Sequence, residues 1–367
     1  MKRILNKIVS NASLLSKSLT KVSHLKKGRM LFKENNLLDT TSNKSYRRKI
    51  KEYWTTHYGK PVNPMWHIAC ANVIGKEDVR YIPHHIWLEE IYPFLNNLTM
   101  HRAYVDKNLS DIFIKTKYKT PRTVIKRMHS RYYCSENLPI SRDKALKRIL
   151  AGPPEQIIKA SGTSSGFGIR KLLINDKNII LNDKIICFNE LASMYGSDFI
   201  VQAKIVQHPK MAEPHPDSVN TVRLVTFRWH DTIRVLLSFA RYGNGGSLID
   251  NAGAGGVCCG INEKGQLYPI AVDMYGKQYR KHPSTGYDFR NQPIIPGYDK
   301  ICEYGIRFHR NIYHLDIVSW DFTIDENGEP VFLEVNSRGA SWVYQFACRR
   351  PMFGDLTEDV LECIRDN

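Results

Sequence analysis

The sequence predicts an α+β fold, in which a basic, largely helical N-terminal region precedes two lobes that each combine strands and helices. Three patterns support this prediction. Residues 53–97 are rich in aromatic side chains at helical spacing. Residues 151–205 alternate apolar strands with one helix, and residues 219–295 alternate apolar and polar side chains, as half-buried strands do.

Local signals predict individual elements along the chain. Ser141 is expected to begin a helix, because its hydroxyl can cap the first turn. Residues 188–195 predict a helix that Gly196 ends. Residues 298–314 predict an amphipathic helix, and residues 355–366 predict a closing helix.

Composition indicates the class of protein. The chain has 367 residues, of which 42% are hydrophobic, enough for a sizeable core and about two to three domains. None of the eight cysteines belongs to a C-x-x-C pair, so the sequence predicts neither a disulfide framework nor a zinc site. No apolar run approaches the ~20 residues of a membrane helix. We therefore expect a cytoplasmic protein.

The net charge of +17 is unevenly distributed. Residues 1–150 contain 30 Lys and Arg against 11 Asp and Glu, a net charge of +19, whereas residues 151–367 contain 23 against 25. Residues 1–30 interleave Lys and Arg with apolar side chains at near-helical spacing, and no acidic residue precedes Glu34. Such a helix is expected either to lie on the anionic inner face of a membrane, as a peripheral contact, or to pack on its own protein.

The aromatic side chains of residues 53–97 have two interpretations. They would stack on bases in a nucleic-acid-binding protein, or they would fill a core. Aromatics at helical spacing more often form a core, and the sequence contains no recognised nucleic-acid-binding module. We therefore expect no nucleic-acid partner.

A hairpin near the C-terminus carries a set of oxygen ligands. Residues 320–336 read as a strand, a tight turn and a second strand. Asp321 lies near the start, and Glu334 and Asn336 lie two apart on the return strand, so that they face the same side. This set suits Mg²⁺ (or Mn²⁺), whereas the alternative is a surface hairpin with solubilising acids. Asp325, in the turn, is expected to be exposed.

A glycine-rich loop follows an apolar strand that ends at Lys159. Its backbone N–H groups could approach anionic oxygens, and Lys159 would add a positive charge beside a phosphate. The loop is neither a P-loop nor a dinucleotide fingerprint, because the required glycine order is absent. Alone it would more often be a flexible turn, but together with the hairpin it predicts half of a nucleotide site.

These motifs, in this order, resemble the ATP-grasp superfamily from about residue 106 onward. The chain is most similar to the sugar-transfer-associated ATP-grasp group, through residues 218–223, 250–257 and 282–286. The resemblance implies an ATP-grasp fold with two α+β lobes gripping ATP. The domains expected are 1–50, a basic amphipathic helix and linker; 51–105, a helical N-terminal domain; 106–205, the first lobe with the glycine-rich loop; and 206–367, the second lobe with the metal hairpin.

The resemblance also implies roles for individual residues. Asp321, Glu334 and Asn336 would bind the metal ion. The residues expected to contact ATP are Lys107, Lys159, the loop residues Ser161, Gly162, Ser164, Ser165, Gly166 and Gly168, and the crossing-strand residues Gln202, Ala203 and Lys204.

Four further residues are candidates for catalysis or substrate binding. Arg223 and Arg241 would hold a phosphate or carboxylate by a planar fork, or else they are surface arginines on strands. Arg338 follows the amide ligand, where relatives place substrate contacts. His282 lies in a loop and would act as an acid, a base or a substrate contact, although a lone loop histidine is more often none of these.

The resemblance implies an ATP- and Mg²⁺-dependent ligase. It would activate a carboxylate as an acylphosphate for attack by an amine or similar nucleophile, in the biosynthesis of cell-surface polysaccharide or sugar conjugates. The substrate would be a small or sugar-linked molecule. Two alternatives remain open: an ATP-dependent kinase for a small molecule or sugar, and a non-catalytic nucleotide-binding partner of a glycan-assembly complex.

Overall fold

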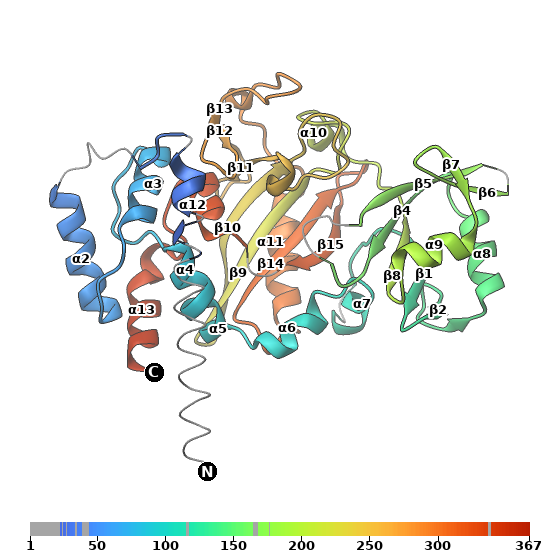
Figure 1. The fold of residues 1–367 in the computed structure, drawn as a ribbon, viewed down its shortest axis with the longest axis horizontal. Helices are drawn as coiled ribbons and strands as arrows, with labels where there is room; N and C mark the ends of the chain where they lie inside the picture. The colour runs from blue at the N-terminus through green and yellow to red at the C-terminus, as the bar shows by residue number, and fades with distance from the viewer. Residues whose placement is uncertain are drawn as a thin grey trace, which may run out of the picture. The chain divides into compact units, whose positions relative to one another are not determined.

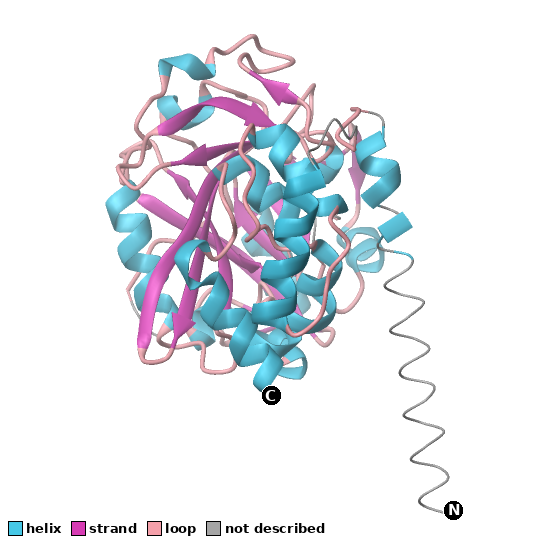
Figure 2. Ribbon diagram, turned by 90° about the vertical axis from the view of Figure 1, so that its left-hand side faces the viewer, coloured by secondary structure: helices cyan, strands magenta, loops and turns pink. Residues whose placement is uncertain are grey.

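The computed structural model describes residues 23, 25–26, 28–33, 35–38, 44–114, 117–163, 168–175, 177–336 and 339–367. Helices and strands both make up large parts of it, which confirms the predicted α+β class (Figure 2). The described residues fall into two compact units. The helical unit takes its residues from 1–96, 272–278 and 338–367, and the two-sheet unit takes its residues from 97–271 and 279–337.

The helical unit is built around aromatic side chains. Its elements are α2 Lys44–Tyr58, α3 Met65–Ile74, α4 His84–Ile86, the π-helix η1 Trp87–Ile91, α5 Tyr92–Leu95, α12 Ser341–Cys348, the short 3-10 helix η4 Gly354–Leu356 and α13 Thr357–Asp366. Trp54, Trp66 and Trp87 are each at most 2% exposed, and the rings of Trp66 and Trp342 lie 5.5 Å apart. These aromatic residues therefore form a core, as the second interpretation of the sequence proposes, rather than a surface on which bases stack.

The C-terminal residues belong to the helical unit, whereas the sequence placed them with the second lobe. Every residue of α12 is buried, and α12 packs against α3 while α13 packs against α2. The side chain of Gln345 accepts a hydrogen bond from the backbone N of Ile82 at 2.8 Å and donates one to its carbonyl at 3.1 Å. Contacts between residues so distant in sequence leave no local signal, so the sequence could not indicate this grouping.

The first lobe of the two-sheet unit contains an antiparallel sheet in the order β3-β2-β1-β8-β4-β5-β6-β7. Its strands are β1 Thr123–Met128, β2 Arg131–Tyr133, β3 Pro139–Ile140, β4 Glu155–Ala160, β5 Arg170–Asn175, β6 Asn178–Leu181, β7 Lys184–Ile186 and β8 Phe199–Ala203. Its helices are α8 Arg142–Leu150, capped by Ser141, and α9 Phe188–Tyr195, which ends at Gly196. Both helix signals in the sequence are thus confirmed.

The second lobe contains a sheet in the order β13-β12-β11-β10-β9-β14-β15. Its strands are β9 Thr221–Trp229, β10 Thr232–Tyr242, β11 Val257–Ile261, β12 Leu267–Val272, β13 Gln278–Tyr279, β14 Ile317–Ile324 and β15 Pro330–Asn336. The remaining helices of the two-sheet unit are α6 Leu98–Tyr104, α7 Ser110–Phe113, α10 Pro209–Ala212, α11 Tyr298–His309 and the 3-10 turns η2 Ala252–Ala254 and η3 Phe289–Asn291. Helix α11 packs on one face of this sheet, against β9, β10, β14 and β15 (Figure 1).

Helix α11 ends at His309, five residues before the end that the sequence predicts. The guanidinium of Arg228 donates to the carbonyl of His309 at 2.7 Å and to that of Ile312 at 3.0 Å. The ring Nε2 of His309 lies 2.8 Å from the carbonyl of Leu315. These contacts satisfy the free carbonyls at the helix end, so the chain can turn back into β14.

The alternation of side chains across β9 and β14 separates a core face from a polar face. Leu224, Trp320 and Phe322 lie in the core that α11 covers, whereas Arg223 and Asp321 point to the opposite face. A bulge on β15 interrupts this alternation, because Asp321 pairs with Glu334 while Phe322 pairs with Phe332.

The amphipathic segment 1–30 falls mostly outside the described residues, which leave out residues 1–22. Among the described residues, no helix has the length and the apolar composition to cross a bilayer.

Gly305, in α11, allows the helix to approach the sheet closely. A methyl group there would clash with Cδ2 of the buried Leu224 and lie 3.3 Å from Cγ2 of Thr226. We expect Gly305→Ala to lower the free energy of unfolding by about 1–2 kcal/mol, even though Ala favours a helix by about 1 kcal/mol. Chemical denaturation measures this change, with Glu303→Ala, at an exposed position of α11, as the control. Equal or higher stability of Gly305→Ala would contradict the close packing of α11 on β9.

Candidate functional site

Three strands place charged side chains next to one another on the polar face of the second sheet. Glu334 on β15 is the Cα partner of Asp321 on β14, and Asp321 is in turn the partner of Arg223 on β9. Directly opposed residues point to the same face of a sheet. The register therefore produces a row of three charged groups, two acidic and one basic.

Asp321 is the most heavily bonded group in this row, and it is only 2% exposed. Nε and Nη2 of Arg223 donate to its two oxygens, each at 2.7 Å, and Nη1 of Arg241 donates at 3.0 Å. Burial raises the pKa of Asp321, but the charges of Arg223 and Arg241 outweigh it and hold the pKa below its ordinary value. Asp321 is therefore ionised at neutral pH.

Arg241 has a second acidic partner. Its Nη2 lies 3.0 Å from Oδ1 of Asp250, whose other oxygen accepts a hydrogen bond from the hydroxyl of Thr221. Burial raises the pKa of Asp250, partly offset by the charge of Arg241. The arginine is thus held between two carboxylates, which fixes its orientation.

Lys107 connects the glycine-rich loop of the first lobe to the hairpin of the second lobe. Its Nζ lies 3.1 Å from Oε2 of Glu334 and donates to the carbonyl of Thr163 at 2.6 Å. Its backbone N donates to the carbonyl of Ser161 at 3.2 Å. The side chain is 8% exposed, so this ion pair is shielded from solvent. Lys107 therefore contacts both the hairpin and the start of the glycine-rich loop, and its contact with ATP stays a prediction.

Lys159 lies close enough to the same groups for its ionisation to depend on them. Burial lowers its pKa from 10.5 to about 8, while the charge of Glu334 opposes this shift and that of Lys107 adds to it. Lys159, Lys107 and Glu334 thus influence one another's charge, and the ATP contact of Lys159 stays a prediction.

The three predicted metal ligands converge on one point. Nδ2 of Asn336 donates to Oδ2 of Asp321 at 2.6 Å and to Oε1 of Glu334 at 3.0 Å. A donor group held between two carboxylate oxygens marks the place that a cation would take. Rotation of the Asn336 amide about its Cβ–Cγ bond would place the amide oxygen, rather than the nitrogen, between the two carboxylates. Two carboxylates and one amide oxygen fit the hard-cation preference of Mg²⁺.

This donor set differs from the usual metal-binding clusters. The described residues contain no group of three His, Cys, Asp or Glu side chains that could hold an ion. The set depends on an amide as its third member, and the two arginines compete with an ion for Asp321.

The glycine-rich loop is described only at its two ends. Ser161 is fully buried, and its hydroxyl donates to Asp106 at 3.3 Å. Gly162 has open space around it, and Gly168 has a φ of +76°, which favours glycine. Three residues predicted to contact ATP, Ser164, Ser165 and Gly166, lie outside the described residues, as does the candidate Arg338. Their roles stay predictions.

The crossing-strand residues lie at the far end of β4 from Lys159. Ala203 pairs with Gln156, whereas Ile200 pairs with Lys159. Ala203 and Lys159 are therefore about 10 Å apart along the strand direction. Nζ of Lys204 lies 2.6 Å from Glu155, and the amide of Gln202 reaches the carbonyl of Pro121 at 3.5 Å. The structure therefore does not place Gln202, Ala203 and Lys204 beside the charged row.

His282 belongs to a buried network that holds the loop after β10. Its Nε2 lies 2.9 Å from the carbonyl of Gly243, and its Nδ1 lies within 3.4 Å of the backbone N of Ser284 and of Thr285. Burial lowers the pKa of His282, so the ring is neutral at pH 7. His215 holds the carbonyl of Gly245 in the same way, at 2.6 Å. These hydrogen bonds indicate that His282 helps to position the loop after β10. An acid–base role of His282 stays a prediction.

Asp325 corrects one expectation about the hairpin. It is 5% exposed rather than solvated, pairs with Lys119 and accepts hydrogen bonds from the backbone N of Asn327 at 3.0 Å and of Glu329 at 2.9 Å. The carboxylate therefore closes the turn, which the sequence alone gave no reason to expect.

Sequence reasoning missed Thr221 and Thr163 as parts of the site. Thr221 holds Asp250 through its hydroxyl, and Thr163 binds Lys107 through its carbonyl. Thr221 alternates with Val222 on a strand, so it could have been assigned to the polar face together with Arg223. No side-chain pattern reveals a backbone carbonyl, so Thr163 left no signal.

Taken with its two antiparallel sheets, this site defines the class of protein: the two-sheet unit has the ATP-grasp fold. The chain belongs to the family described as sugar-transfer associated ATP-grasp, whose model matches residues 89–359, more than half of its length. No curated protein matches the chain.

Among solved structures, the chain is similar to several ligases at low identity. The VanG D-Ala:D-Ser ligase from Enterococcus faecalis is 16% identical, with a TM-score of 0.42, over 71% of this chain and 61% of that one. The L-amino acid ligase from Bacillus licheniformis is 14% identical, with a TM-score of 0.37, over 72% and 49%. The D-alanine-D-alanine ligase from Coxiella burnetii is 10% identical, with a TM-score of 0.42, over 74% and 60%. The chain thus spans less than two thirds of each, and the likeness does not extend to substrates.

The buried ion pairs predict that two metal-ligand substitutions differ in their effect on folding. We expect Asp321→Asn to lower the free energy of unfolding by about 3 kcal/mol, because it leaves Arg223 and Arg241 buried without their shared counter-charge. Glu334→Gln should cost about 1 kcal/mol, since the side chain of Glu334 is 25% exposed and has one charged partner. Denaturant unfolding without nucleotide measures both, and equal losses would contradict the assigned charge network.

Proposed function

We propose that this protein is an ATP- and Mg²⁺-dependent ligase. It activates a carboxylate as an acylphosphate, which an amine or similar nucleophile then attacks. The proposed setting is the cytoplasmic synthesis of cell-surface polysaccharide or sugar conjugates, which the family description favours. One observation carries the proposal: Lys107 contacts Glu334 and the first residues of the glycine-rich loop at once, so that phosphate-binding and metal-binding groups form one cluster.

The residues of the cluster fit phosphoryl transfer, which requires alignment and charge neutralisation rather than a protein nucleophile. Mg²⁺, when held by Asp321, Glu334 and Asn336, supplies neutralisation of phosphate charge. Lys107 and Lys159 offset the charge of the phosphates from the first lobe. Arg223 and Arg241 keep Asp321 ionised and oriented.

The charge balance of the cluster favours joint binding of ion and nucleotide. Three carboxylates, of Asp250, Asp321 and Glu334, face four cations, of Arg223, Arg241, Lys107 and Lys159, whose pKa of about 8 keeps it mostly charged at neutral pH. These side chains sum to a net charge of about +1, so a divalent ion alone would add to an uncompensated positive charge. A triphosphate carries the missing negative charge. The ion is therefore expected to bind together with ATP.

An extended ligand also suits the positions of the crossing-strand residues. Lys159 lies at one end of β4, and Gln202, Ala203 and Lys204 follow toward the other end, at about 7 to 13 Å along the strand. In the proposed complex, phosphates lie at the Lys159 end and the base lies at the other end.

Turnover should depend on Glu334 and not on Glu329, an acid of the same hairpin outside the donor set. We expect Glu334→Gln to lower ATP turnover by about 100-fold or more, because it removes a charged donor from the metal set while leaving the fold intact. The assay measures ADP while amino acids and nucleotide-sugars are screened as substrates, with products identified by mass spectrometry. Glu329→Gln, a half-exposed acid paired with Lys300 in the same hairpin, is the matched control. Wild-type turnover by Glu334→Gln would contradict the role of Glu334 as a metal ligand, whereas absence of substrate-dependent turnover by the wild-type protein would favour the non-catalytic alternative.

The same assay separates the ligase from the kinase. A ligase releases free phosphate only when the second nucleophile is present, whereas a kinase leaves the phosphoryl group on its product. Product mass and free phosphate, measured together, therefore decide between the two reactions.

Nucleotide binding should take up a proton at Lys159. At a pH of about 9, one unit above its pKa of about 8, the free side chain is mostly neutral, and nearby phosphates raise its pKa so that it becomes charged on binding. The calorimetric heat of ATP-analogue binding should then depend on the ionisation enthalpy of the buffer at pH about 9, where the terminal phosphate is already ionised and releases no proton of its own. Lys159→Arg, which stays charged, should abolish this dependence. If the binding heat of Lys159→Arg still depended on the buffer, the proton taken up on binding would belong to a group other than Lys159.

A further inference from the structure

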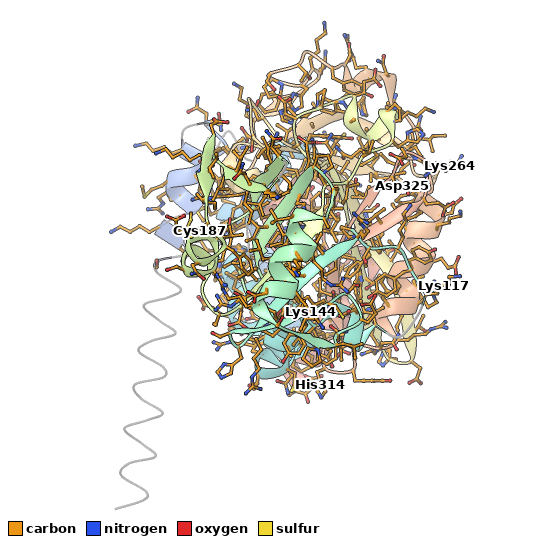
Figure 3. All side chains as sticks on the ribbon, turned by 90° about the vertical axis from the view of Figure 1, so that its right-hand side faces the viewer. Lys117, Lys144, Cys187, Lys264, His314 and Asp325 are labelled. Carbon is orange, nitrogen blue, oxygen red and sulfur yellow. The ribbon has the colours of Figure 1, made fainter. Side chains whose placement is uncertain are left out.

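A basic groove lies on the first lobe, beside α8 and α9, with a volume of about 680 Å³. Its lining includes Arg127, Arg131 and Arg142 and contains no carboxylate. We propose that this groove binds the phosphate group of an organic phosphate. Figure 3 looks onto this side of the lobe, where Lys144 of α8 and Cys187, which caps α9, are labelled.

The groove is separate from the candidate nucleotide site. On β8, Phe199 pairs with Arg127, and the next residue, Ile200, pairs with Lys159. Successive residues of a strand point to opposite faces, so Arg127 and Lys159 lie on opposite faces of the first sheet. Phe199 belongs to the core of that lobe together with residues of α8 and α9, so the face of Arg127 is the one that the helices cover.

Two of the three arginines are held in place by the protein. Nη1 of Arg127 donates to the carbonyls of Ala192 at 2.9 Å and Gly196 at 2.7 Å, and its guanidinium lies 5.2 Å from the ring centre of Tyr132. Nε and Nη2 of Arg142 donate to Oδ1 of Asn189 at 3.0 and 2.6 Å. Fixed guanidinium groups lose little entropy when they bind an anion.

The positive charge of the groove is only weakly compensated. Within the described part of the chain, the side chain of Arg131 makes no hydrogen bond or ion pair. Asp143 lies 3.5 Å from Arg142 but is 82% exposed, so solvent weakens that pair. Asp198, whose pKa is lowered mainly by the hydroxyl of Ser197, also interacts with Arg127. A net positive charge therefore remains.

The rim of the groove keeps an unfavourable backbone conformation. His129 and Ser130 form the turn between β1 and β2, with φ of +47° and +67°. Such two-residue turns favour Asn and Gly, because other side chains are strained there. Ser130 lines the groove, and its backbone N donates to the carbonyl of Ser197 at 3.0 Å. This hydrogen bond fixes the turn at the rim of the groove.

The chemistry of the lining favours a phosphate with an organic part. Guanidinium forks match phosphate oxygens, and the charge of three arginines suits a dianion better than a single carboxylate. The volume exceeds that of a phosphate ion, and Tyr132, Pro139 and Ile140 add apolar surface for the rest of the molecule. Leu138 and Met194, next to lining residues, are 62% and 53% exposed, so a lipid headgroup is one source of this phosphate and a soluble phosphate ester is the other.

The test uses the full chain and two probes. Glycerol phosphate is titrated by calorimetry, and vesicles of phosphatidylcholine with or without phosphatidic acid are tested by co-sedimentation. Arg131→Ala and Arg142→Ala remove lining charges, and Arg148→Ala, an exposed arginine of α8 outside the lining, is the matched control. Lys159→Ala alters only the opposite face of the first sheet, so this variant should bind the two probes at the groove as the wild-type protein does.

We expect each lining variant to weaken binding of at least one probe by about tenfold, with Arg148→Ala unchanged. If the lining variants bind glycerol phosphate more weakly, the ligand is a soluble phosphate ester. If they bind more weakly only to vesicles that contain phosphatidic acid, the ligand is a lipid headgroup. Equal weakening by Arg148→Ala, binding of neither probe, or variant-dependent binding of a polyglutamate peptide alone would overturn the proposal. None of these outcomes depends on ATP turnover, so they leave the proposed ligase activity untouched.

Discussion

The ion pair between Asp321 and Arg223 is the interaction on which the candidate site depends. Burial favours the protonated acid, yet two guanidinium groups bonded to its oxygens keep Asp321 ionised. Only an ionised carboxylate is a good donor to a hard cation. The pair also joins β9 to β14, so the strand that carries Asp321 cannot shift without breaking it. The ion pair with Arg223 therefore fixes both the charge and the position of Asp321 in the donor set.

The other polar contacts extend this pair into a chain that crosses the lobe. Asp250 holds Arg241, Arg241 and Arg223 hold Asp321, and Asn336 links Asp321 to Glu334. Lys107 then carries the chain to the first lobe. Each member has a partner of opposite charge or a matching hydrogen bond, which is what buried polar groups require.

Local patterns predict most of the helices and strands, and they also predict that the three proposed metal ligands lie on one hairpin. The hairpin with Asp321, Glu334 and Asn336 follows from alternation and a turn signal, both contained in adjacent residues. The bonds between Arg223 and Asp321 join residues 98 positions apart, so no local pattern contains them. For the same reason the sequence leaves surface arginines open as an alternative, and it gives no sign that α12 packs against α3 or that α13 packs against α2. The end of α11 was missed because a side chain from β9, Arg228, terminates it.

The bulge on β15 has a consequence for how this hairpin can vary. Leu333 is the extra residue, and because of it Phe332 and Val335 both reach the core while Glu334 stays opposite Asp321. Removing that residue would shift the strand by one place, and an apolar side chain would then stand where a carboxylate is needed, or a carboxylate would enter the core. The number of residues at this point of the hairpin is thus fixed by the geometry of the pairing with β14.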